Sequence, residues 1–260
     1  MAVAVMLIEL AGPVGAGKTT VAAELARLLR AEGLAVLTPA EAVARCLERT
    51  WAGRSLGHGR LGRAAARGAV AWHALAFALE RPRLAWHVLA SQRRRTIPWW
   101  HRRIIVGLFF QVAGQERLLR RALRAGEAVV FEEGLVHRAV NLYAWAPGRL
   151  ETDAVRAYLA LLPAADLTVL VRAPLEVCLR RAGARGLPIR LRDKDGRTVE
   201  RFMQHAQAII ELAGRALAAG GRTAIMVDNG GSLEATAAAL RERLAAQAHG
   251  RRAAALVGGG

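Results

Sequence analysis

The residues best suited to chemistry form one glycine-rich run near the start of the chain. At every fixed position the run fits the Walker A pattern G-x-x-x-x-G-K-[ST], and it reads Gly12-Pro13-Val14-Gly15-Ala16-Gly17-Lys18-Thr19. Glycines let the backbone wrap a phosphate, with the amide groups pointing inward. Lys18 would place a positive charge beside the β- and γ-phosphates, and the Thr19 hydroxyl would hold Mg²⁺. The run predicts a site for nucleotide phosphates, and we include the next residue, Thr20, in it.

The segments on either side of this run have the pattern that a phosphate-binding loop requires. Residues 3–10 are almost continuously apolar, which is typical of a strand buried on both faces. Residues 20–30 repeat leucine and valine at helical spacing. A strand, the loop and a helix therefore follow one another, and we expect the Lys18 side chain to be solvated at the start of that helix.

Composition limits the class of protein. The 260 residues suit one α/β domain with an insertion. The net charge of +17 favours an anionic substrate, a nucleic acid or an anionic membrane surface. Cys46 and Cys178 lie far apart and lack metal-ligand spacing, which fits a reduced, cytoplasmic protein. The start of the chain has no basic segment typical of a signal peptide, and no apolar run reaches the roughly 18 residues of a membrane span.

Residues 43–125 interrupt the alternation of strands and helices. This stretch holds 17 arginines and three glutamates, a net charge of +14. Apolar periodicity predicts helices over residues 64–79, 84–93 and 101–124, with a glycine-rich loop over residues 53–62. The stretch also contains five of the six tryptophans, namely Trp51, Trp72, Trp86, Trp99 and Trp100. We interpret it as a helical insertion that covers the place where a second substrate binds.

The arginines and tryptophans of this insertion allow several interpretations. They could grip an anionic acceptor, or contact an anionic membrane, since arginine with tryptophan is typical of interfacial segments. They could also bind nucleic acid through phosphates and stacking, which is the least favoured of the three. In the simplest interpretation the tryptophans belong to the core of a helical cap and the arginines are merely solvated.

Two neighbouring carboxylates, Glu132 and Glu133, follow a predicted strand at residues 128–131. Ligands of open α/β sheets bind beyond the carboxyl ends of the strands. A carboxylate there can orient Mg²⁺ or take a proton from an attacking hydroxyl. Because neighbouring strand residues point to opposite faces, we favour Glu132, the first after the apolar run. The alternative is an ordinary solvated carboxylate.

An arginine-rich stretch at residues 180–194 follows a strand at residues 165–172 and a helix at residues 174–184. Arginines on a mobile flap can close over a nucleotide and neutralise the charge that develops during phosphoryl transfer. We assign this role to Arg181 and Arg185. The alternative is a solvated surface loop in a chain that is rich in arginine throughout.

The order of these features resembles the nucleotide kinases of the thymidylate kinase and deoxynucleoside kinase type. The resemblance covers residues 1–38 and 126–248, and it includes a lid segment with Pro174, Glu176, Leu179, Arg181, Arg185 and Gly186. Glu132-Glu133 stands where the family has an acidic residue followed by arginine. The helix after that pair lines the acceptor pocket in the family, and here it carries His137, Arg138, Asn141 and Tyr143. Val227-Asp228 matches a closing strand whose aspartate lies near the adenine ring.

The resemblance implies a three-layer P-loop NTPase fold with a mainly parallel five-stranded sheet. A single kinase-like domain would span residues 1–248, with the insertion at 43–125, a lid at 180–197 and a flexible tail at 249–260. ATP and Mg²⁺ would be the cofactors. Residues 12–20 and Asp228 would bind the nucleotide, Thr19 and Glu132 would hold the metal, and Lys18, Glu132, Arg181 and Arg185 would act in catalysis.

Two functions fit the sequence. The first is a phosphotransferase that moves the γ-phosphate of ATP to a small, anionic acceptor such as a nucleoside monophosphate, or to a nucleoside. The second is an ATP-hydrolysing switch that docks on a membrane or polymer through its basic insertion. The charged lid favours the kinase, because a switch needs a water-positioning residue for which the sequence has no clear candidate. The oligomeric state, a homodimer included, is left open.

Overall fold

The computed structural model describes residues 6–50, 59–93 and 97–257, with side chains as far as residue 246. Trp51, Arg94, Arg95 and most of the predicted glycine-rich loop lie outside these residues. None of the helices in the described part combines the length and the hydropathy that a membrane-spanning helix needs.

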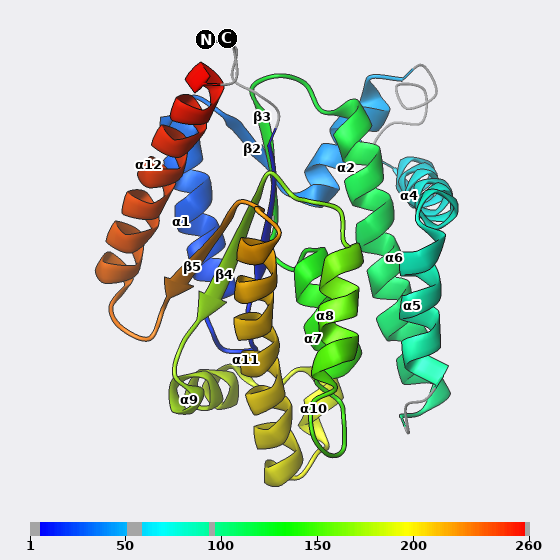
Figure 1. The fold of residues 1–260 in the computed structure, drawn as a ribbon. Helices are drawn as coiled ribbons and strands as arrows, with labels where there is room; N and C mark the ends of the chain where they lie inside the picture. Colours follow the sequence, from blue (N-terminus) through cyan, green and yellow to red (C-terminus); the bar gives the residue numbers. More distant parts are fainter. Residues whose placement is uncertain (1–5, 51–58, 94–96, 258–260) are drawn as a thin grey trace.

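A five-stranded parallel sheet forms the centre of the molecule (Figure 1). The strands lie in the order β2-β3-β1-β4-β5, and each pairs in parallel with its neighbour. Their bounds are Met6–Ala11 (β1), Ala35–Leu37 (β2), Glu127–Phe131 (β3), Leu167–Arg172 (β4) and Ala224–Asp228 (β5). The connections after β1 and β4 leave in opposite directions, so the edge beyond these two strands is a switch point where ligands bind. The predicted α/β class with a parallel sheet is confirmed.

Helices cover both faces of this sheet and make three layers (Figure 1). On one face lie α1 (Lys18–Ala31) and α12 (Leu233–Val257). On the other lie α7 (Leu135–Tyr143), α8 (Thr152–Leu161) and α11 (Gly196–Ala219). At the lower end, beyond the strands, are α9 (Leu175–Arg185) and the short α10 (Ile189–Arg192). The backbone of α12 is helical as far as Val257, within the segment where we expected a tail.

The insertion forms a further group of helices outside the second layer (Figure 1). It comprises part of α2 (Pro39–Glu48), then α4 (Arg60–Glu80), α5 (Pro82–Arg93) and α6 (Trp99–Ala122). The last three match the helices that apolar periodicity predicts. Helix α6 packs along α4 and also contacts α2 and α7, so it joins the insertion to the sheet domain.

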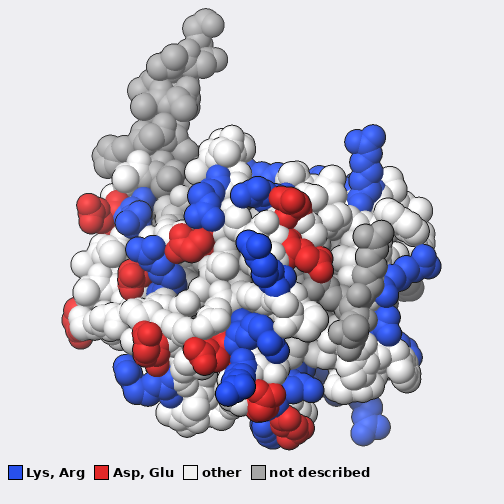
Figure 2. Space-filling model, turned by 60° about the horizontal axis from the view of Figure 1, so that its bottom comes forward, with Lys and Arg blue, Asp and Glu red and all other residues white. Residues whose placement is uncertain are grey.

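The insertion exposes large apolar side chains. Trp72, Trp86, Trp99 and Trp100 are 51–66% exposed, and Leu61, Leu75 and Leu79 of α4 are exposed with them. The interpretation of these tryptophans as core residues of a helical cap is therefore wrong. Arg93 stacks over the Trp86 ring and Arg103 over the Trp99 ring. Figure 2 shows the lower end of the molecule. At the right edge of this view, over the insertion, basic side chains have no acidic side chain beside them among the described residues.

A buried carboxylate of the central strand β1 lies near the insertion. Glu9 of β1 accepts hydrogen bonds from the backbone of Val136 and from the Thr168 hydroxyl of the neighbouring strand. Burial, followed by the nearby Glu116 carboxylate of α6, raises the pKa of Glu9 to about 7. A Cβ on Gly134 would lie 2.3 Å from a Glu9 carboxylate oxygen, so only glycine fits at that position.

Candidate functional site

The glycine-rich run forms a loop between β1, which ends at Ala11, and α1, which begins at Lys18. Gly15 and Gly17 have φ of 76° and 84°, a conformation that side-chain-bearing residues rarely adopt. Gly17 is also the N-cap of α1 and offers no side chain to the helix. The first amides of α1 have no partner within the helix, so they point at the place where an anion binds.

Neighbouring elements press closely against this loop. A Cβ on Gly12 would lie 2.4 Å from the backbone oxygen of Val171 in β4, and one on Gly15 would lie 2.2 Å from that of Cys178 in α9. At Gly17 the added carbon would lie 2.0 Å from the side-chain amide of Asn229. The loop therefore needs glycine both for its backbone angles and for its contacts.

Asn229 is a site residue that the sequence analysis missed. Its Nδ2 donates to the carbonyl of Ala16 at 2.8 Å, and its Oδ1 accepts from the Thr236 hydroxyl at 3.0 Å. The side chain is buried and holds the loop to the end of β5. The available signal was its position directly after Asp228, at the carboxyl end of a strand.

Lys18 lies inside the loop. Its Nζ donates to the carbonyls of Gly12 and Pro13 at 3.0 and 3.2 Å, and stands 3.9 Å from Oε1 of Glu133. Only 11% of the side chain is exposed, so the expectation of a solvated lysine is wrong. Burial lowers the pKa of Lys18, and the Glu133 carboxylate offsets part of that effect.

Glu132 lies beside Thr19, the hydroxyl-bearing residue at the end of the loop. The Thr19 hydroxyl donates to Oε2 of Glu132 at 2.8 Å, so the two residues predicted to hold Mg²⁺ are in direct contact. Mg²⁺ is typically held by one or two protein oxygens together with substrate phosphates, and this pair fits that chemistry. In the described residues no group of three or more His, Cys, Asp or Glu side chains is placed to hold a metal by itself.

Glu133 faces the loop as well. Its carboxylate lies 3.1 Å from Nη2 of Arg138 and 3.3 Å from Nε2 of His137, and Arg138 also donates to its backbone oxygen. Burial raises the pKa of Glu133, but His137, Lys18 and Arg138 outweigh it and hold the pKa far below its usual range. Mainly because of burial, the pKa of His137 falls to about 4, so His137 is neutral at pH 7 and the charged partners are Lys18 and Arg138.

Near Glu133 lies a group of polar side chains that include buried donor atoms without a hydrogen-bond partner in the described part of the chain. Arg190 of α10 donates to Oδ1 of Asn141 at 3.0 Å. Among the buried polar atoms of the described residues that have no hydrogen-bond partner are four donors of this group, namely Arg138 Nε, Asn141 Nδ2, Trp145 Nε1 and Arg190 Nη1. Buried donors are almost always satisfied in native proteins, so this donor cluster is suited to a ligand that supplies acceptor atoms.

The two predicted lid arginines differ in position. Arg181 donates from Nη1 to the backbone oxygen of Asn229 at 2.7 Å and lies next to Gly17. Arg185 is exposed one turn further along α9, where it makes no hydrogen bond or ion pair with another described residue. The structure therefore brings Arg181 to the loop and leaves Arg185 outside it.

Asp228 lies at the carboxyl end of β5 and is exposed. Its carboxylate accepts from the backbone amide of Gly230 at 2.9 Å and lies 3.4 Å from Nε of Arg172. Together with Pro13 of the loop, Arg172 and Pro174, it lines a cavity of about 480 Å³. The aspartate predicted near the nucleotide base thus lies beside a cavity that reaches the loop.

Known proteins add a likeness in structure only. No family model matches the chain, and no curated protein matches it in sequence. A deoxyadenosine kinase from M. mycoides with bound dATP is similar at a TM-score of 0.46 and 13% identity, over 92% of this chain and 98% of that one. The same kinase with bound dCTP is similar at a TM-score of 0.46 and 12% identity, over 93% of this chain and 100% of that one.

Proposed function

We propose that the protein is an ATP-dependent phosphotransferase that moves the γ-phosphate to a small anionic acceptor such as a nucleoside monophosphate. The observation that carries the proposal is the contact between the Thr19 hydroxyl and the Glu132 carboxylate, at 2.8 Å. It joins the phosphate-binding loop to the end of β3, at the edge of the sheet where ligands bind. A hydroxyl and a carboxylate in this arrangement are what Mg²⁺ with a nucleotide requires.

Each residue of the loop has a task in this reaction. The backbone N–H groups of the loop, which Pro13 lacks, and the Lys18 ammonium bind the phosphates of ATP, and Lys18 exchanges its contacts with Gly12 and Pro13 for the β- and γ-oxygens. Thr19 and Glu132 would hold Mg²⁺, which would neutralise charge on the phosphates. Arg181, held beside Gly17, meets the charge that develops on the transferred group. Arg185 can take part only after α9 and α10 move toward the loop.

Glu133 and the donor cluster favour an anionic acceptor. Lys18, Arg138 and Arg190 bring three positive charges to this side of the loop, and Glu133 is the carboxylate among them. An acceptor with a phosphate supplies the oxygen atoms that the unpartnered nitrogens of Arg138, Asn141 and Arg190 lack. Glu132 takes the proton when the acceptor attacks through a hydroxyl, whereas Glu133, whose pKa is held far below its usual range, stays ionised.

The experiment is transfer of labelled γ-phosphate from ATP, with Mg²⁺, to a panel of nucleosides, nucleoside monophosphates and other hydroxyl compounds. We expect transfer to a phosphorylated acceptor and not to the matching nucleoside. Glu132→Gln should lower the rate and raise the Mg²⁺ concentration needed, because it weakens the metal site. Glu200→Gln, on the exposed side of α11, is the matched control. ATP consumption that no acceptor stimulates would overturn the proposal.

One observation favours a second candidate, an ATPase switch that docks on a membrane. Four tryptophans of the insertion are exposed, and two of them carry stacked arginines, an arrangement typical of side chains at a lipid interface. The test is ATP hydrolysis without acceptor, in the presence of vesicles of anionic or zwitterionic phospholipid. Stimulation by anionic vesicles alone would favour the switch. The cytoplasmic location and a homodimer stay predictions.

A further inference from the structure

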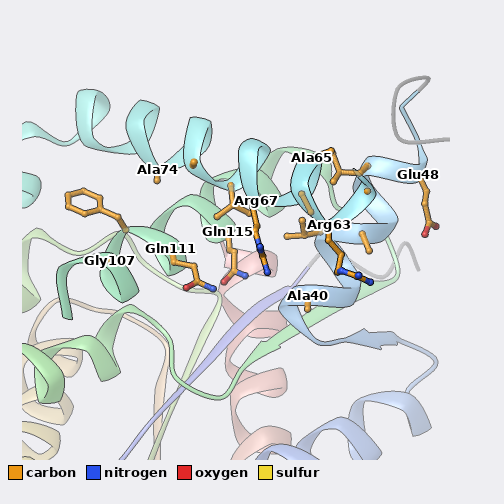
Figure 3. A pocket seen from close by; sticks show the side chains of 17 residues that line it. Ala40, Glu48, Arg63, Ala65, Arg67, Ala74, Gly107, Gln111 and Gln115 are labelled. Atoms are coloured by element: carbon orange, nitrogen blue, oxygen red, sulfur yellow. The ribbon is translucent and has the colours of Figure 1, made fainter. Parts of the chain in front are cut away.

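A second cavity lies between helices α2, α4 and α6, and no residue of the glycine-rich loop lines it (Figure 3). Its volume is about 710 Å³, within the range of small-molecule sites, roughly 300–1,000 Å³. Apolar side chains form its walls, among them Val43 and Leu47 of α2, Ala66 and Val70 of α4, and Phe110 of α6. We call this space the insertion groove.

One edge of the insertion groove is basic. Arg63 and Arg67 extend from α4 across the groove, and Arg67 points toward Gln115 of α6 (Figure 3). Neither arginine has a carboxylate within ion-pair distance among the described residues, although Glu48, the last residue of α2, also lines the groove. The first turn of α4 has no acidic residue, and Gly59 at its N-cap has no side chain to satisfy the helix amides. This edge therefore favours an anion.

Glycine keeps the insertion groove open. At Gly114 in α6 an added Cβ would lie 2.3 Å from the backbone oxygen of Val70, so close packing of α4 on α6 explains that glycine. At Gly107, two turns earlier, an added Cβ would meet no described atom within 4 Å, and the residue lines the groove. Glycine inside a helix costs up to about 1 kcal/mol relative to alanine, and packing does not account for it at Gly107.

We propose that the insertion groove binds an anionic amphiphile, with its hydrocarbon chain between α2, α4 and α6 and its carboxylate or phosphate head at Arg63 and Arg67. The small residues of the walls leave a continuous apolar space for the chain. The two guanidinium groups and the amides of Gln111 and Gln115 supply the polar contacts that fix a head group. The acceptor of the proposed kinase reaction is a different ligand in a different site.

Charge favours this occupant over a second copy of the chain. The insertion carries a net charge of +14, so two copies that met at the insertion groove would bring arginines against arginines. The negative head group of an amphiphile is instead attracted to these arginines, and its hydrocarbon chain removes apolar surface of the groove from water.

The experiment is calorimetric titration of the full chain with dodecanoate, dodecyl phosphate and uncharged dodecanol, each below its micelle concentration. We expect one site for an anionic amphiphile and binding about tenfold weaker for dodecanol, the effect of losing charge-assisted contacts. The preferred anion identifies the head group as carboxylate or phosphate. Arg63→Ala with Arg67→Ala should reduce binding of the anion to the level of dodecanol, and Arg60→Ala, outside the groove, should not.

A matched pair of glycines tests the location. Gly107→Leu places a side chain in the insertion groove and should abolish binding. Gly68→Leu makes the same change on α4, where an added Cβ also meets no described atom and the residue does not line the groove, and it should leave binding unchanged. Sedimentation of the same variants reports self-association. Absence of binding by both anions, equal binding after Gly107→Leu, or an oligomer that only Gly107→Leu disrupts would overturn the proposal.

Discussion

Glycine has opposite roles in the two regions of the molecule. In the loop, a Cβ added to Gly12, Gly15 or Gly17 would lie 2.0–2.4 Å from backbone or amide atoms of β4, α9 or the turn after β5. In the insertion, Gly68 and Gly107 border space that the described residues leave empty. The loop is therefore shaped by contact at all three glycines, whereas the insertion combines one close contact, at Gly114, with open positions at Gly68 and Gly107.

This difference shows where each region takes its specificity. The loop is held by elements from the whole length of the chain, so its geometry is set before a nucleotide arrives. The insertion exposes apolar and basic side chains, so the ligands that we propose for it would be selected by negative charge and apolar surface. The predictions below test how far the two regions differ.

The largest effect is expected from Lys18→Ala. It removes the positive charge that the loop holds for the phosphates, and loss of such a contact lowers the rate roughly a hundredfold or more. Transfer of the γ-phosphate and the thermal midpoint should be measured together. The midpoint should change little, because Glu133 keeps its contacts with Arg138 and His137. Arg156→Ala on exposed α8 is the control, and a fully active Lys18→Ala protein contradicts the assignment.

Glu9→Gln tests the buried carboxylate of β1 whose pKa is raised by burial and by Glu116 of the insertion. The folded protein holds a proton on Glu9 that the unfolded chain releases, so stability falls as the pH rises from about 4.5 to about 7. The free energy of unfolding falls by about 3 kcal/mol at most, and it does not recover above pH 7. In urea unfolding between about pH 4.5 and pH 7, Glu9→Gln should remove this pH dependence of stability. Near pH 7 the variant should be more stable than the unchanged protein.

The α6 partner of Glu9 provides the control for that experiment. Glu116→Gln removes the second carboxylate but leaves Glu9 buried, so the slope should become smaller and remain measurable. A slope unchanged in both variants would show that the insertion and the sheet are not coupled through this pair.

A smaller effect is expected at Asn229. Asn229→Ala removes the donor that holds Ala16 and leaves the Thr236 hydroxyl without one acceptor, which costs about 1–3 kcal/mol of unfolding free energy. Asn229→Asp keeps the shape but places a carboxylate beside the loop, so it should weaken ATP binding more than the alanine does. Equal ATP affinity in the three proteins, measured by calorimetry, would argue against a role for Asn229 in the loop.

The smallest effect comes from the glycines of the insertion. Gly68→Ala should raise the free energy of unfolding by about 0.5–1 kcal/mol, because it restores helix propensity in free space. The same change at Gly17 should destabilise the protein, since its φ of 84° and the Asn229 amide exclude a Cβ. Urea titrations of Gly68→Ala and Gly17→Ala measure both changes in the free energy of unfolding. Changes of the same sign would contradict the difference between the two regions.

Local patterns predicted much of the fold. A continuous apolar strand, a glycine-rich loop and a helical repeat specify the start of the domain, and helical periodicity with Pro82 and Pro98 delimits the helices of the insertion. The position of the two carboxylates was harder, because strand alternation would send Glu132 and Glu133 to opposite faces. The strand ends at Phe131, so both residues lie in the turn beyond it and both reach the loop.

Other features depend on contacts that no local pattern contains. Asn229 meets the loop across 213 positions of sequence. Both sides of α4 are apolar, so helical spacing alone could not tell that the side with Trp72, Leu75 and Leu79 is the exposed one. Arg190 is one arginine among many in the sequence, and only the fold brings it to Asn141.

The hydrogen bond from Asn229 to Ala16 has a consequence for the order in which the protein matures. Ribosomes deliver the loop before Val171 and Cys178, which press on it, and deliver Asn229, which holds it, later still. A nascent chain that ends before Asn229 carries the complete motif without the contacts that shape it. The nucleotide binding that we propose would therefore be acquired only once Asn229 has been synthesised, and ATP would stabilise chains that contain Asn229 but not shorter ones.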